Sequence, residues 1–234
     1  MLPAVIRLAV LDIAGTTVRD DDLVLECFVA AAEASGLRAT REEMNARMGQ
    51  GKLEVFEELA GRQTKTPEER TALRDAAYTK FQATLEQAYR TQGVTAMRGA
   101  HETMAWLRSN DVRVALNTGF YRSVTELIVE RAGFAGLVDV VICVDEVPLG
   151  RPAPFMIFEA MKRTRTASVA HVLVAGDTPV DAIAGRNAGA RLVVGVTSGA
   201  HDARTLRAAH ATHVLAGVWE LPDLVRRDQR LAPR

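Results

Sequence analysis

Residues 6–17 read IRLAVLDIAGTT, an apolar run followed by an acid, a glycine and two threonines. The run from Ile6 to Leu11 is rich in Val, Ile and Leu, which is typical of a fully buried strand in a parallel sheet. Short runs of the same kind recur along the chain, and we interpret each as a further buried strand: Val112–Leu116, Val138–Val144, His171–Ala175 and Arg191–Val196.

Amphipathic stretches lie between these runs and have the spacing of helices that pack one face on a core. Strands that alternate with helices predict an α/β fold with a Rossmann-like, doubly wound parallel sheet. The stretches that we interpret as helices of this core are Ala100–Asn110, Tyr121–Ala132, Ala153–Arg163 and Thr178–Ala188.

Residues 20–92 break the alternation, because they contain no convincing strand pattern and are typical of successive helices. A long helix is expected to start near Pro67, since proline suits a first helical turn and the acids at 68 and 69 favour the positive end of the helix dipole. We therefore predict a helical cap domain at 20–92, inserted into a Rossmann-like core formed by residues 1–19 and 93–234.

Composition excludes several classes of protein. Lys plus Arg and Asp plus Glu each number 29, so no net charge favours nucleic acid or an anionic membrane as a partner. No apolar run approaches the length of a membrane span. Cys27 and Cys143 match no ligand spacing, which disfavours a zinc site or a disulfide framework. We expect a cytoplasmic protein.

Ligands of open parallel sheets bind at the carboxyl ends of the strands. The segments that follow the predicted strands are rich in carboxylates, hydroxyls and glycine: Asp12–Thr17, Asn117–Phe120, Asp145–Pro152 and Gly176–Asp181.

Asp12 directly follows the first predicted strand, where a carboxylate can attack phosphorus as a nucleophile. Gly15 permits a tight turn whose free backbone N–H groups face phosphoryl oxygens. Asp177 and Asp181 lie four residues apart at a predicted helix start, which suits a hard cation with oxygen ligands. The plainer alternative for Asp12 and Asp177 is helix capping.

Thr118 and Arg151 follow strands as well, and a hydroxyl and a planar guanidinium both donate to phosphoryl oxygens. Taken singly, each also fits an ordinary cap or a surface charge. The ordered set Asp12, Thr118, Arg151 and Asp177 with Asp181, on a core with a helical insertion after the first motif, resembles the haloacid dehalogenase superfamily.

The resemblance implies that Asp12 attacks phosphorus in line and that water then hydrolyses the aspartyl-phosphate. It implies a Mg²⁺ cofactor held by Asp12, the Ala14 carbonyl and Asp177, with Asp181 as a nearby acid, while Thr118 and Arg151 neutralise transition-state charge. It also implies that substrate contacts come from Gly15, Thr16, Met48 and Gly119.

Most phosphatases of that superfamily have a second aspartate two residues after the nucleophile, and this chain has Ala14 there. Without that acid, ester hydrolysis loses a general acid–base contribution of about 100- to 10,000-fold. The DxAGTT pattern and the stretches at 150–154 (GRPAP) and 185–189 (GRNAG) are instead similar to the phosphonatase branch, the group of phosphonoacetaldehyde hydrolase.

Phosphonatases break a carbon–phosphorus bond with a cap lysine that forms a Schiff base with the substrate aldehyde. Residues 48–52 (MGQGK) match the segment that carries this lysine, so the resemblance makes Lys52 the candidate amine. Such a lysine needs a pocket that lowers its pKa. The alternative is a solvated lysine on a helix surface, among Glu54, Glu57 and Glu58.

The chain departs from the phosphonatase pattern at three places. Val55 replaces a histidine that serves in proton transfer, Phe120 replaces a tyrosine, and residues 19–22 (RDDD) replace small and apolar residues. These departures favour a relative of the phosphonatases that acts on a related substrate. Tyr121, or one of the acids at 20–22, is a hypothetical substitute for the missing proton carrier.

Three functions remain open at this point. The first is a phosphonatase-like hydrolase that cleaves the carbon–phosphorus bond of a small phosphonate metabolite, an aldehyde or a close analogue, through Asp12 and Lys52. The second is a phosphomonoesterase of the phosphoglycolate phosphatase type, which acts on a small phosphorylated metabolite and in which Lys52 only binds substrate. The third is a non-catalytic binding module, which the clustered acids disfavour. The resemblance also suggests a homodimer.

Overall fold

Six strands form one parallel sheet in the order β3-β2-β1-β4-β5-β6 in the computed structural model, which describes residues 5–231. The predicted α/β class and Rossmann-like sheet are confirmed. The strands are β1 (Leu8–Asp12), β2 (Arg113–Thr118), β3 (Val140–Cys143), β4 (Val172–Gly176), β5 (Leu192–Val196) and β6 (His213–Leu215).

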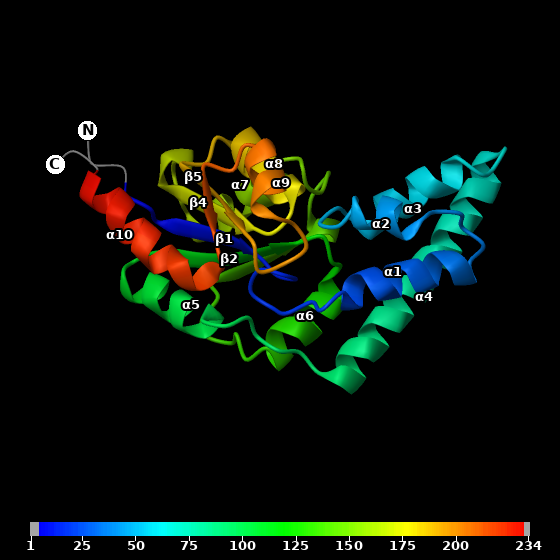
Figure 1. The fold of residues 1–234 in the computed structure, drawn as a ribbon, viewed down its shortest axis with the longest axis horizontal. Helices are drawn as coiled ribbons and strands as arrows, with labels where there is room; N and C mark the ends of the chain where they lie inside the picture. Colours follow the sequence, from blue (N-terminus) through cyan, green and yellow to red (C-terminus); the bar gives the residue numbers. More distant parts are fainter. Residues whose placement is uncertain (1–4, 232–234) are drawn as a thin grey trace.

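Both faces of the sheet are covered by helices, which explains why its inner strands are almost wholly apolar. Figure 1 shows α5 (Ala100–Ser109), α6 (Arg122–Arg131) and α10 (Leu221–Leu231) on one side of the sheet and α7 (Phe155–Thr164), α8 (Pro179–Ala188) and α9 (Ala203–Ala208) on the other. Short 3₁₀ turns lie at Val144–Glu146, Val169–His171 and Val218–Glu220.

Alternate residues of β1 pack into different layers, as the two-residue period of a strand requires. Leu8 and Val10 belong to a buried cluster with Met156 of α7. Ala9 and Leu11 belong to a second, larger cluster that includes residues of α5 and α10 and continues into the helices of residues 20–92. The sheet and the inserted helices therefore share one hydrophobic core.

Residues 20–92, all of which the structure describes, contain four helices and no strand: α1 (Leu23–Ala34), α2 (Arg41–Asn45), α3 (Lys52–Gly61) and α4 (Pro67–Gln92). The long helix begins at Pro67, as predicted, behind a capping box of Thr66 and Glu69. Phe28, Phe56 and Phe81 meet edge to face at the centre of these helices, with ring centroids 5.0–6.2 Å apart.

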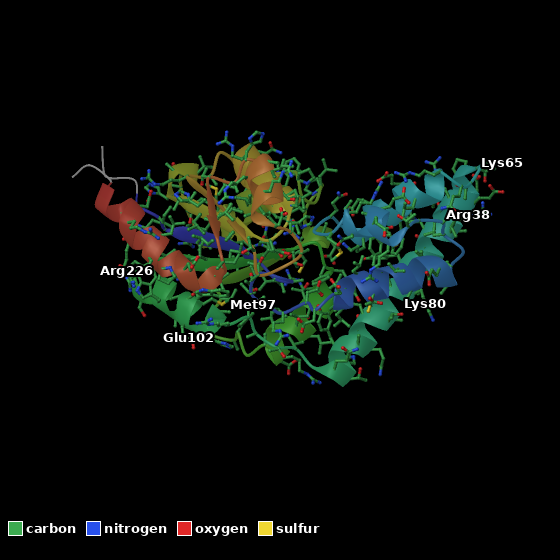
Figure 2. The ribbon with its side chains drawn as sticks, in the orientation of Figure 1. Arg38, Lys65, Lys80, Met97, Glu102 and Arg226 are labelled. Carbon is green, nitrogen blue, oxygen red and sulfur yellow. The ribbon has the colours of Figure 1, made fainter. Side chains whose placement is uncertain are left out.

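We refer to residues 20–92 as the helical segment. Its separation from the core as a cap domain stays a prediction, and residues 1–4 and 232–234 of the predicted core lie outside the described residues. In Figure 2, Arg38 and Lys65 mark the end of the helical segment that is farthest from the sheet. No helix among residues 5–231 combines the length and the apolar character that crossing a membrane requires.

Candidate active site

Functional side chains gather at the carboxyl edge of the sheet, where β1, β2 and β4 end side by side. Asp12 is the last residue of β1 and Thr118 the last of β2, while Asp177 directly follows β4. The pairing of Asp12 with Asn117 in the parallel ladder fixes the position of the carboxylate along the sheet. Asp12, Thr118 and Asp177 line one pocket with Arg151. This is where open parallel sheets bind ligands.

Three buried carboxylates form a cluster in this pocket. One oxygen each of Asp12, Asp177 and Asp181 lies within 4.8 Å of the others. Arg151 Nη1 donates to Asp12 Oδ1 at 2.5 Å and also to Asp181 Oδ1. When all of these groups are ionised, the three carboxylates outnumber the one guanidinium, so the cluster has a net negative charge. Because buried charge of one sign is costly without a partner, the cluster suits a hard cation such as Mg²⁺.

Burial and the neighbouring charges also change the pKa values of Asp12 and Asp177. Burial raises the pKa of Asp177 to about 7, and the charge of Asp181 adds to the effect. Burial also raises the pKa of Asp12 above its usual range, although the guanidinium of Arg151 acts in the opposite direction. A bound divalent cation favours the ionised carboxylates and lowers both pKa values.

Asp177 is held in place from two sides. Thr16 Oγ1 donates to one carboxylate oxygen at 3.1 Å, and the Ala200 N–H donates to the other at 2.8 Å. A Cβ at Gly15, where φ is +80°, would lie 2.5 Å from Asp177 Oδ2, so only glycine lets this loop approach the carboxylate. The N-cap of α8 is Thr178, and the capping alternative for Asp177 is therefore wrong.

Asp181 has less hydrogen-bonding capacity left than Asp177, because it accepts three hydrogen bonds, one of them from a cation, whereas each Asp177 oxygen accepts one from a neutral donor. Asp181 Oδ2 accepts from the N–H of Thr178 at 3.1 Å and from its hydroxyl at 2.5 Å, and Oδ1 accepts from Arg151. Arg151 uses Nη1 for both of its acid partners. Its Nε is buried and has no hydrogen-bond partner within residues 5–231, so it is a donor still available to a bound anion.

Lys52 is buried in the same pocket, with only 4% of its surface exposed. It is the first residue of α3, its Nζ donates to the Gln50 carbonyl at 3.2 Å, and it lies 4.9 Å from the centroid of the Phe28 ring. Burial, reinforced by the charge of Arg151, lowers the pKa of Lys52 to about 8. The alternative of a solvated lysine on a helix surface is wrong.

The backbone of the helical segment at Gly49 and Gln50 packs closely against Gly119, which directly follows β2. A Cβ at Gly119 would lie 2.9 Å from the Gln50 oxygen and 3.1 Å from the Gly49 oxygen. The Gln50 carbonyl that contacts Gly119 is also the acceptor for Lys52. The absence of a side chain at Gly119 therefore allows the loop that carries Lys52 to reach the sheet edge.

The structure brings the predicted site residues together. Eight of them line the pocket, and the other three do not line it but contact Asp177 or Arg151. The first group is Asp12, Ala14, Met48, Lys52, Thr118, Gly119, Arg151 and Asp177, and the second is Gly15, Thr16 and Asp181. Their roles stay predictions.

The sequence analysis missed one part of the site, the loop after β5, and left the identity of the proton carrier open. The loop after β5 contributes the Ala200 N–H to Asp177, and its Ser198 hydroxyl donates to the Gly15 carbonyl at 2.9 Å. The rule that ligands bind at the carboxyl ends of parallel strands would have identified this loop, because it follows the predicted strand Arg191–Val196. Among the hypothetical proton carriers, Asp20 is the one of the acids at 20–22 that lines the pocket, whereas the Tyr121 hydroxyl donates to the Gln82 carbonyl at 3.2 Å.

Comparison with known proteins places this architecture in a family. The family model for haloacid dehalogenase-like hydrolases matches residues 6–189. Two phosphonoacetaldehyde hydrolases are similar in sequence: the one from Bacillus cytotoxicus is 26% identical over 95% of this chain and 87% of its own length, and one from Bacillus cereus is 28% identical over 84% and 78%.

Solved structures show the same fold. A phosphonoacetaldehyde hydrolase-like protein from Oleispira antarctica superposes with a TM-score of 0.84 at 20% identity, covering 98% of this chain and 95% of that one. A hydrolase from Pseudomonas syringae gives a TM-score of 0.82 at 20% identity, with 97% and 100% covered. At this level of identity the likeness concerns the fold alone.

Proposed function

The chain belongs to the haloacid dehalogenase-like hydrolase family, and from that premise we propose that it hydrolyses the carbon–phosphorus bond of a small phosphonate aldehyde. One observation carries the proposal: Lys52, buried and with a pKa of about 8, shares a pocket with Asp12. A lysine that is partly neutral at neutral pH can form a Schiff base with a carbonyl, a step that a hydrolase of phosphate esters does not use.

Lys52 prepares the leaving group. Its neutral amine adds to the aldehyde carbon, and loss of water gives a protonated imine. When the carbon–phosphorus bond breaks, its electron pair moves into the imine and leaves as an enamine. We infer that residues 20–92 act as the cap in this reaction, because Met48, Gly49, Gln50 and Lys52 supply one wall of the pocket.

Asp12 takes the phosphoryl group. Its carboxylate attacks phosphorus opposite the departing carbon, and water later hydrolyses the aspartyl-phosphate. Arg151 orients Asp12 through the 2.5 Å contact and offers its unpaired Nε to a phosphoryl oxygen, while the Thr118 hydroxyl lies at the end of the adjacent strand. Both donors stabilise the negative charge of the transition state.

The carboxylate cluster fits Mg²⁺, because it offers buried oxygen ligands with uncompensated negative charge. Asp12, the Ala14 carbonyl and Asp177 would hold the ion, whereas Asp181, which accepts three hydrogen bonds, keeps Arg151 in place. A bound Mg²⁺ neutralises phosphoryl charge and acts as a Lewis acid.

Mg²⁺ should raise the thermal stability of the protein, and more at pH 8 than at pH 6. The pKa of Asp177 is raised to about 7, so the stability that its protonated form contributes is present at low pH and is lost as the pH rises through 7. Above that pH the bound cation relieves the repulsion. At a hundredfold excess over Kd the expected rise in Tm is about 5–10 °C.

The matched variant is Asp177→Asn, which keeps the shape of the side chain. Calorimetry should show a higher Tm than the wild type in the absence of metal and little further rise with Mg²⁺. An equal Mg²⁺ shift in the wild type and in this variant would exclude Asp177 as a ligand.

The direct test of the proposal is trapping of the imine. The protein is incubated with Mg²⁺ and phosphonoacetaldehyde, reduced with borohydride and digested, and the peptides are analysed by mass spectrometry while phosphate release is assayed in parallel. We expect a stable adduct on Lys52 together with phosphate. No adduct and no phosphate, alongside rapid release of phosphate from ordinary esters, would contradict the proposal and favour the phosphomonoesterase.

Adduct formation should depend on pH with a midpoint near 8. Only the neutral amine attacks a carbonyl, and since the pKa of Lys52 is lowered to about 8, about a tenth of it is neutral at pH 7. The rate should rise with pH and level off above about pH 9. Initial rates of trapping between pH 6 and 10.5 measure this curve, and a midpoint above 9.5 is the result expected of an ordinary solvated lysine.

A further inference from the structure

Imine chemistry needs a group that moves protons, and the position of the phosphonatase histidine does not supply one here. Val55 is 1% exposed and packs in the hydrophobic core of the helical segment. The Tyr121 hydroxyl is bound to the backbone of α4. A proton carrier for Lys52 must therefore come from another residue of the pocket.

Asp20 lines that pocket together with Lys52. It lies in the connection between β1 and α1. This connection is fixed by the Arg19 N–H, which donates to the Thr95 carbonyl at 2.9 Å, where the chain leaves α4. Its Oδ1 accepts from the Val24 N–H at 3.0 Å, which fixes the carboxyl group at the start of α1. Asp20 is thus held by backbone contacts rather than free in solvent.

The other acids of the pocket are already engaged. Asp12 is paired with Arg151, and Asp177 with Thr16 and Ala200. The Asp20 carboxyl group accepts one hydrogen bond, at Oδ1, and within residues 5–231 no hydrogen bond or salt bridge engages its Oδ2. It is therefore the carboxyl group of the pocket that is left for proton transfer.

The surroundings of Asp20 suit a group that both donates and accepts protons. Burial raises its pKa, while the Val24 N–H and the charge of Lys52 act in the opposite direction and the charges of Asp22 and Asp21 add to the rise. On α1 and α4 it faces Cys27 and Tyr89, whose own pKa values are raised by burial and by the charge of Asp20. The Tyr89 hydroxyl is buried with no hydrogen-bond partner in the described part of the chain.

We infer that Asp20 is the acid–base residue of the amine chemistry at Lys52, taking the place of the histidine that Val55 replaces. The inference rests on the proposed function. When the amine has added to the aldehyde, the Asp20 carboxyl donates a proton to the carbinolamine hydroxyl, the carbon–oxygen bond breaks, and water leaves with formation of the imine. After the carbon–phosphorus bond breaks, the enamine carbon takes up the proton that is released when water hydrolyses the aspartyl-phosphate, which gives the product imine. Asp20 recovers its own proton from the water that adds to this imine, so the protons of the cycle balance.

The test compares Asp20→Asn with Asp21→Asn. Asparagine at 20 keeps an oxygen that accepts from Val24 but cannot transfer protons, so a purely structural role predicts almost no change. Asp21 is the neighbouring, exposed acid, and asparagine tolerates its positive φ of 43°. The readouts are the initial rate of borohydride trapping on Lys52 across pH, and the Mg²⁺ shift in Tm as evidence that the site is folded.

We expect Asp20→Asn to slow trapping about 100-fold or more, with an unchanged Mg²⁺ shift, and Asp21→Asn to stay within about twofold. Because the charge of Asp20 raises the pKa of Lys52, the variant should also move the midpoint to lower pH. Slower trapping despite more neutral amine is the signature of proton transfer.

The outcomes separate the two proposals. Equal trapping rates in Asp20→Asn and the wild type would overturn the role of Asp20 and leave the proposed function standing. An absence of adduct in the wild type itself would overturn the proposed function and the role of Asp20 with it.

Discussion

Asparagine in place of Asp12 is expected to lower kcat by about 10⁴-fold or more, because in the proposed mechanism the carboxylate bonds to phosphorus and an amide oxygen is a far weaker nucleophile. The fold should be retained, since the amide oxygen can still accept from Arg151 and the substitution removes one charge from a buried, acidic cluster. The measurement is phosphate release under saturating substrate, with Tm recorded in parallel.

Asp21→Asn is again the matched control, because it removes an exposed carboxylate that does not line the pocket. It should keep kcat within about twofold. Turnover of Asp12→Asn within tenfold of the wild type would exclude an aspartyl-phosphate at this position and would require a different nucleophile.

Lys52→Arg should abolish the trapped adduct and lower carbon–phosphorus cleavage by about 10³-fold or more. Arginine keeps the positive charge but stays protonated and does not form imines, so the variant separates the charge of the residue from its nucleophilicity. Phosphate release from the phosphonate aldehyde and mass spectrometry of the reduced protein are the two measurements.

Lys65→Arg is the control, since Lys65 is exposed at the far end of the helical segment (Figure 2) and should leave both signals unchanged. Hydrolysis of phosphate esters that is undiminished in Lys52→Arg, with no phosphonate activity in the wild type, would identify the lysine as a binding residue of a phosphomonoesterase.

The sequence predicted five strands of the sheet because each is a short apolar run, and four of them are almost wholly buried. It missed β6, since His213 is exposed and the other two residues of this edge strand are only half-buried. It also ended β1 at Leu11 and β2 at Leu116, whereas the ladder continues to Asp12 and Thr118. Polar residues extend these strands because backbone pairing, which hydropathy does not report, continues beyond the apolar core.

The burial of Lys52 could not be derived from its neighbours in sequence, which are a glycine, a leucine and an acid. It depends on contacts with Phe28 in α1 and with the Gln50 carbonyl, and on the close approach to Gly119. These are long-range contacts that only the folded chain assembles. Resemblance to a family pointed to the residue, but its lowered pKa is a property of the tertiary structure.

The contact between Gly119 and the Gln50 carbonyl links the packing of the helical segment against the sheet to the pKa of Lys52. In a conformation without this contact, the Lys52 amine would lie farther from Arg151 and be more exposed to water, and its pKa would rise towards that of an ordinary amine. An open molecule would then be inert towards stray aldehydes in its surroundings. On the proposed mechanism, the Lys52 amine would be neutral enough to react only in the assembled pocket that also contains Asp12, so assembly of the pocket would limit covalent reaction with other aldehydes.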